Sequence, residues 1–213
     1  MLFKSFFGMR EKSPLQPPGL ACPPRGLNML AASGGASLWN AKDAMLDNLF
    51  RRLTAQPVRG AALFSAATDE ARQPHWFRDG RVPDTIDGRF AMLSTVVALI
   101  LVRLEREGDF GNELSVSLTE RFIAVMESEH RELGLSDPTL GKTVRKLVGS
   151  LARRTALWRT AVATTDWSEP TRESVYRSDP AEDVARHTRA ALKALWSRLE
   201  RTGPGALAEG KIE

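Results

Sequence analysis

The stretch QPHWFRDGRVPDTIDGRFAMLSTVVALILVRLEREG, residues 73–108, predicts a loop followed by a long apolar helix. Val82-Pro83 favours extended backbone, because the proline ring disfavours helical geometry at the preceding residue. Asp84 or Asp87 is then placed to cap the first free N–H groups of the helix. The run 91–102 contains no charged residue, so the middle of the helix has no polar face. Such a helix has to be covered by protein on every side.

The rest of the chain predicts further helices and no β-strands. Apolar residues recur at spacings of three and four, and no turn flanked by alternating strands is present. The S-x-x-E pattern at 117–120 has the form of a capping box, and Asp-Pro pairs at 137 and 179 are typical helix starts. We therefore expect an all-α fold, a single helical bundle domain of about six helices. These helices begin near residues 37, 57, 84, 117, 138 and 179, and the third ends at Gly108.

Proline and glycine density sets the expected domain limits. Residues 1–36 predict a flexible, disordered arm, residues 37–202 the helical domain, and residues 203–213, which open with Gly-Pro-Gly, a flexible tail. The single cysteine, Cys22, excludes an intrachain disulfide and fits a reducing compartment. The scarcity of acidic residues before position 43 suits an unstructured tail, a transit peptide or a lipid contact. The apolar run 91–102 is too short to span a bilayer.

One expected helix carries a positive face. No acidic residue lies between Asp137 and Asp166, and the basic residues cluster within about a third of the circumference. This face suits docking to ribosomal RNA, anionic lipid or an acidic protein, or it is a solvated helix surface. Its residues are Lys142, Arg145, Lys146 and Arg153.

Signals for catalysis or cofactor binding are weak. Residues 136–143, SDPTLGKT, match a phosphate-binding loop except at the first glycine, and a capped helix start explains them as well. Asp84 and Asp87 also permit an acid–base pair, but helix capping explains them better. We expect no metal, no cofactor and no catalytic residue. The three histidines, His75, His130 and His187, are far apart in sequence and lack ligand spacing.

Two blocks of sequence resemble the ubiquinol–cytochrome c chaperone family. The first is QP-x-WF at 73–77 followed by VPDTIDGRF at 82–90 and the apolar helix; the second is RELGLSD at 131–137 with GK-x-V-x-K at 141–146. The resemblance covers about residues 43–162. Within the family, the chain looks more like the alphaproteobacterial members. Two positions depart from the family pattern: Ala91, where an acidic residue is expected, and Val96, where a histidine is common.

The resemblance implies a non-enzymatic assembly chaperone for the ubiquinol–cytochrome c reductase complex, complex III. The family's mitochondrial members act on newly made cytochrome b and bind near the ribosomal exit tunnel with a smaller partner protein. Cytochrome b or another complex III subunit is thus the expected partner, at the cytoplasmic face of the inner membrane or the mitochondrial matrix side. The alternative is a general ribosome- or RNA-binding helical module, and an enzyme built on the loop aspartates is a third hypothesis.

The loop before the apolar helix is the expected rim of a client-binding groove. Aromatic residues in such a loop either fold back as a lid on the core or line a groove that receives a partner segment. The candidate client-binding residues are Trp76, Phe77, Asp84, Arg89 and Phe90.

Overall fold

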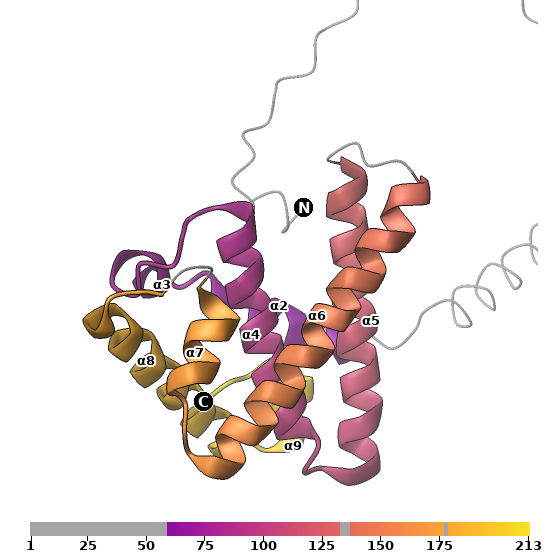
Figure 1. The fold of residues 1–213 in the computed structure, drawn as a ribbon. Helices are drawn as coiled ribbons and strands as arrows, with labels where there is room; N and C mark the ends of the chain where they lie inside the picture. The colour runs from indigo at the N-terminus through magenta and orange to yellow at the C-terminus, as the bar shows by residue number, and fades with distance from the viewer. Residues whose placement is uncertain (1–58, 133–136, 177–178) are drawn as a thin grey trace, which may run out of the picture. The chain divides into compact units, whose positions relative to one another are not determined.

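The computed structural model describes residues 59–132, 137–176 and 179–213, and every regular element in these ranges is a helix (Figure 1). The expected all-α class is confirmed. The arm 1–36 and the helix expected from residue 37 lie outside the described residues. The described helices are α2 (Arg59–Ala71), α3 (Pro74–Arg78), α4 (Ile86–Leu104), α5 (Gly108–Glu132), α6 (Asp137–Thr164), α7 (Ser168–Val175), α8 (Glu182–Arg201) and α9 (Pro204–Ala208).

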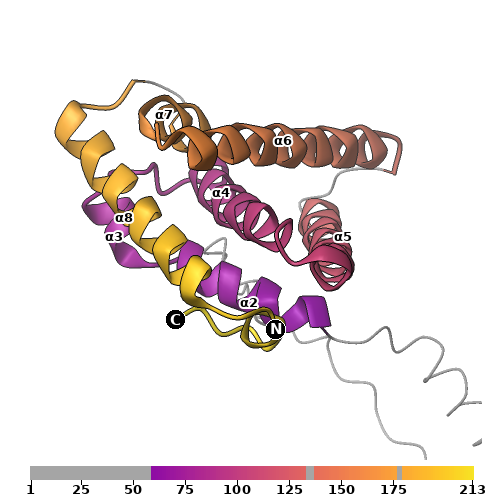
Figure 2. The ribbon, with the colours of Figure 1, turned by 90° about the horizontal axis from the view of Figure 1, so that it is seen from below.

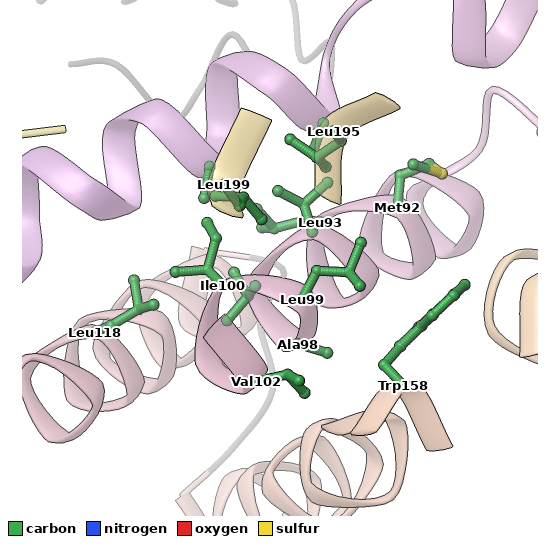
Figure 3. Packing of buried hydrophobic residues seen from close by; sticks show 14 of the residues in the cluster. Met92, Leu93, Ala98, Leu99, Ile100, Val102, Leu118, Trp158, Leu195 and Leu199 are labelled. Carbon is green, nitrogen blue, oxygen red and sulfur yellow. The ribbon is translucent and has the colours of Figure 1, made fainter. Parts of the chain in front are cut away.

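Helix α4 is the centre of the core. It packs against α2, α5, α6, α7 and α8, and Figure 2 shows it between α6 on one side and α2 with α8 on the other. All residues in 91–100 are buried, as the absence of a polar face requires. Figure 3 shows Leu93 of α4 near Leu195 and Leu199 of α8, with Trp158 of α6 approaching from the opposite side. No helix in the described ranges has the length and hydropathy needed to cross a membrane.

The corner between α4 and α5 differs from the sequence prediction. Helix α4 ends at Leu104, and Gly108, with φ of +58°, begins α5 instead of closing α4. The two backbones meet closely there, since a Cβ at Gly111 would lie 2.1 Å from the carbonyl oxygen of Leu104. The capping box expected at Ser117 was wrong: this residue lies inside α5, and its hydroxyl donates to the Glu113 carbonyl at 3.0 Å.

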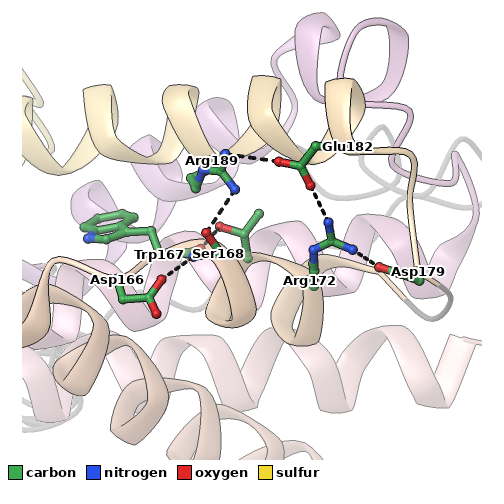
Figure 4. A network of polar contacts seen from close by, with 8 residues as sticks. Asp166, Trp167, Ser168, Arg172, Asp179, Glu182 and Arg189 are labelled. Carbon is green, nitrogen blue, oxygen red and sulfur yellow. Dashed lines mark hydrogen bonds and ion pairs between the residues drawn. The ribbon is translucent and has the colours of Figure 1, made fainter.

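The C-terminal helices include two that the sequence did not predict, α7 and α9. The apolar stripe expected for α8, from Val184 to Leu199, is buried. Helix α8 begins at Glu182 and not at Asp179, and Asp179 pairs with Arg172 of α7. Figure 4 shows how Glu182 then joins Arg172 to Arg189, tying α7 to the first turns of α8.

Residues 203–213 pack on the domain, which differs from the flexible tail predicted from Gly-Pro-Gly. Pro204 starts α9, whose Leu207 is fully buried, and α9 contacts α2 and α5. The Glu213 N–H donates to the Thr202 hydroxyl at 3.0 Å. Proline is favoured at the first position of a helix, and Pro204 therefore starts α9 shortly after α8 has ended.

Candidate functional site

A groove of about 750 Å³ lies beside the first turn of α4, bordered by α5, α6 and α7. Because residues 83–91 of the sequence signature form one of its walls, we call it the signature groove. Its size is typical of a binding cleft. The residues that matter for its chemistry are Ile86, Phe90, Met126, Lys146, Leu147, Arg154, Glu173 and Ser174.

The first turn of α4 holds the mouth of the signature groove in place. Thr85 is the N-cap, and its hydroxyl accepts a hydrogen bond from the Gly88 N–H at 3.2 Å. Thr85, and neither Asp84 nor Asp87, therefore occupies the N-cap position, while Asp87 lies in the first turn of α4. Gly88 lies so close to the preceding loop that a Cβ there would be 1.9 Å from the Pro83 carbonyl oxygen. Only glycine permits this approach without moving the backbone.

The five candidate client-binding residues do not share one place. Phe90 lines the signature groove. Trp76 is fully buried and its indole N–H donates to the Glu70 carbonyl at 2.8 Å, so it belongs to the core and not to a client surface. Asp84 and Arg89 form an ion pair at 2.6 Å, and the Arg89 guanidinium lies over the Phe77 ring at 5.8 Å. The lid interpretation thus describes Trp76 correctly.

Arg154 lies inside the signature groove and was missed as a site residue by sequence reasoning. Its guanidinium donates to the Ser150 hydroxyl and to the Ser174 carbonyl, the latter at 3.2 Å, and lies 6.0 Å from the Phe90 ring centre. Burial lowers the pKa of Arg154, and neighbouring Arg153 lowers it further. The signal was present in the sequence, because position 154 falls on the apolar stripe between Leu151 and Trp158.

The positive face of α6 is exposed as the helical spacing predicted. Lys142, Arg145, Lys146 and Arg153 all have exposed side chains. Lys146 also lines the signature groove, so the two surfaces adjoin. Helix α6 begins at Asp137, which makes residues 137–143 helical and rules out a phosphate-binding loop in that segment.

Two histidines that are distant in sequence come together between α3 and α8. The rings of His75 and His187 are 5.7 Å apart, centre to centre, although the two residues are far apart in sequence. Burial lowers the pKa of His75, followed by the charge of His187, while Glu70 and Asp79 raise it. Within the described ranges, no three His, Cys, Asp or Glu side chains are grouped to hold a metal ion.

The depressed pKa of His75 predicts a loss of stability on acidification. Between the folded-state pKa and the ordinary value of 6.5, the unfolded chain binds more protons than the folded chain. The free energy of unfolding should therefore fall as the pH drops through 6.5, and it should fall less in His75→Gln. Urea unfolding at pH 7.5 and pH 5.5 measures both. An equal fall in the variant would contradict this assignment.

These features define a helical binding domain. It is a bundle around one buried helix, and its groove is lined by apolar side chains and by the guanidinium of Arg154. The family model described as "Ubiquinol-cytochrome C chaperone" matches residues 78–202, and the chain belongs to this family. The match continues through α8, beyond residue 162, where the resemblance in the sequence ended.

The crystal structure of the Cbp3 homolog from Brucella abortus has the same fold. It superposes with a TM-score of 0.64 at 24% sequence identity, covering 79% of this chain and 94% of that chain. A search of curated proteins found no match.

Proposed function

We propose that this protein is a non-enzymatic assembly chaperone of complex III that holds newly made cytochrome b in the signature groove. The observation that carries the proposal is the family match over residues 78–202, which includes every residue lining the groove. The family description names a ubiquinol–cytochrome c chaperone. Complex III is the enzyme that transfers electrons from ubiquinol to cytochrome c.

The walls of the signature groove suit an apolar client segment. Ile86 is 47% exposed at its mouth, and Phe90 and Leu147 are partly buried around it. An amphipathic helix binds such a groove through side chains spaced three and four residues apart. Cytochrome b is a membrane protein, so its emerging segments supply apolar side chains that need cover.

The positive face of α6 suits a position at the membrane surface. Basic residues are attracted to anionic lipid headgroups by roughly 1 kcal/mol each near the surface. We place the protein peripherally at the cytoplasmic side of the inner membrane, or at the matrix side in a eukaryote, with the ribosome and a small protein as further partners. No cofactor is part of this proposal.

Deletion of the gene is expected to lower complex III while leaving the other respiratory complexes at their normal levels. Difference spectra of b- and c-type haem together with activity assays of each complex measure this. A plasmid copy of the wild-type gene should restore complex III, and Ile86→Asp should restore it poorly, because it replaces the large apolar side chain exposed at the groove mouth with a further carboxylate. Normal complex III in the deletion strain would refute the proposed function.

A general ribosome- or RNA-binding module is the second candidate, favoured by the exposed positive face of α6. Replacing Lys142, Lys146 and Arg153 by serine should then weaken ribosome co-sedimentation and flatten its salt dependence. The slope of log K against log salt should fall by about 2 to 3, since each phosphate contact contributes roughly 0.7 to 0.9. Unchanged co-sedimentation in this triple variant would exclude the module. The matched control replaces three exposed cations of α8, Arg186, Lys193 and Arg201.

A further inference from the structure

The charge of Arg154 is not matched by a carboxylate from the described residues. Its hydrogen-bond acceptors are the Ser150 hydroxyl and carbonyl and the Ser174 carbonyl, all of them neutral. No ion pair joins Arg154 to any part of the chain that the structure describes. A desolvated cation is costly unless an opposite charge accompanies it.

Two polar atoms near the Ser174 side of the groove have no hydrogen-bond partner. They are Nε of Arg154 and the hydroxyl oxygen of Ser174, both buried. Ser174 is only 2% exposed, and both residues line the signature groove. Buried polar groups are nearly always paired in proteins, so this pair points to an acceptor brought by a ligand.

The acidic residues of the signature groove lie at its rim, where the charge of Glu173 partly offsets the lowering of the Arg154 pKa but forms no ion pair with its guanidinium. The Glu173 carboxylate faces Arg153 at 4.0 Å, where their side chains are 45% and 76% exposed. Asp87 is exposed in the first turn of α4, where the positive end of the helix favours a negative charge. The partly buried charge that a ligand meets inside the groove, that of Arg154, is therefore positive.

The shape of the surface indicates a linear ligand. A second hollow of about 400 Å³ adjoins the signature groove, because Pro83 and Tyr176 line both. The lining includes the apolar side chains of Phe90, Met126 and Leu147, and the Phe90 ring lies 6.0 Å from the Arg154 guanidinium. A ligand that fills this space needs a carboxylate among apolar groups and more length than a small ion has.

We propose that the signature groove binds a client segment in which one Asp or Glu interrupts an apolar run, and that this carboxylate pairs with Arg154. The carboxylate would accept a hydrogen bond from the Arg154 Nε that has no partner now, while the other guanidinium nitrogens keep their neutral acceptors. Apolar neighbours of the acid would contact Phe90 and Leu147. This inference rests on the proposed function, for which it names the feature of the client that is recognised.

Synthetic 15-residue peptides that tile cytochrome b, offered to the purified full-length protein, test the inference. We expect the bound peptides to contain an acid within an apolar run. Changing that acid to Asn or Gln should weaken binding to the wild-type protein at least tenfold, and by less than twofold for Arg154→Gln. Arg186→Gln, which removes an exposed cation of α8 outside the groove lining, is the matched control and should retain the full preference.

Several outcomes would overturn the inference. One is equal binding of acidic and amide peptides to the wild-type protein, which needs no variant and so does not depend on how Arg154→Gln folds. Another is a preference that persists in Arg154→Gln. A third is binding only to vesicles with anionic lipid, which would make the groove a lipid site. Complex III levels in the deletion strain are a separate measurement: if they fall while the acid preference is absent, the inference fails and the proposed function stands.

Discussion

Gly88→Ala is expected to destabilise the protein by about 2–4 kcal/mol and to abolish client binding. The new Cβ would lie 1.9 Å from the Pro83 carbonyl oxygen and 2.9 Å from its carbon, and both atoms belong to the backbone. Overpacking of this kind costs about 1–3 kcal/mol, and loss of the Thr85 cap adds about 1 kcal/mol. The alanine Cβ forces the loop at the groove mouth away from α4. This movement alters the binding surface in addition to lowering the stability.

Gly149→Ala is the matched control for that substitution. Gly149 lies on the exposed side of α6, and nothing lies within 4 Å of a Cβ built there. Alanine is favoured over glycine in a helix interior by about 1 kcal/mol, so this variant should be as stable as the wild type or more stable. Urea unfolding monitored by circular dichroism compares the two variants. Equal stability of Gly88→Ala and the wild-type protein would contradict the described geometry.

Arg103→Met is expected to cost about 3–5 kcal/mol, although Arg103 is far from the signature groove. The side chain is 9% exposed and joins the end of α4 to the end of α8. Its guanidinium donates to the carbonyls of Leu199 at 2.9 Å and Thr202 at 3.2 Å, and it pairs with Glu107. Methionine fills much of the space but donates no hydrogen bond, which leaves those carbonyls and Glu107 without their partner.

Arg106→Met is the control for Arg103→Met, because it shows how much stability is lost when an exposed arginine is replaced. Arg106 pairs with Glu200 at 3.0 Å, but their side chains are 52% and 43% exposed. Its guanidinium also lies over the Trp196 ring at 5.1 Å. Exposed ion pairs and cation–π contacts each contribute about 1 kcal/mol or less. Thermal unfolding should therefore show a large fall in midpoint for Arg103→Met and a small one for Arg106→Met.

The fold was predictable where one apolar pattern decided the structure. The uncharged run 91–102 could only be a covered helix, and the stripe from Val184 to Leu199 could only be a buried face. Helix ends were less predictable, because several capping residues compete locally. Thr85 caps α4 although two aspartates flank it, and Gly108 starts a helix where a stop was expected. Those outcomes depend on the tertiary contacts of the turn.

The location of the candidate site could be predicted from the sequence, but the residues that line it could not. The signature string does border the groove, yet of its aromatic residues only Phe90 lines it, while Trp76 is in the core. Arg154 was overlooked because basic residues on α6 were assigned to a single exposed face. Its position on the apolar stripe was visible, but its contacts with Ser174 depend on α7, a helix that the sequence did not predict. Likewise, His75 and His187 meet only through packing of α3 on α8.

The central position of α4 has a consequence for how the domain folds. Residues 91–100 are all buried, and their cover comes from several neighbours, since α2, α5, α6, α7 and α8 all contact α4. A partly assembled bundle would leave an apolar helix face in water. Helices α7 and α8, which follow α4 in the chain, therefore complete the cover of a helix that is synthesised before them. During its own synthesis this protein therefore exposes an apolar helix to water until α7 and α8 are made. We propose that it protects the apolar segments of its client from the same exposure.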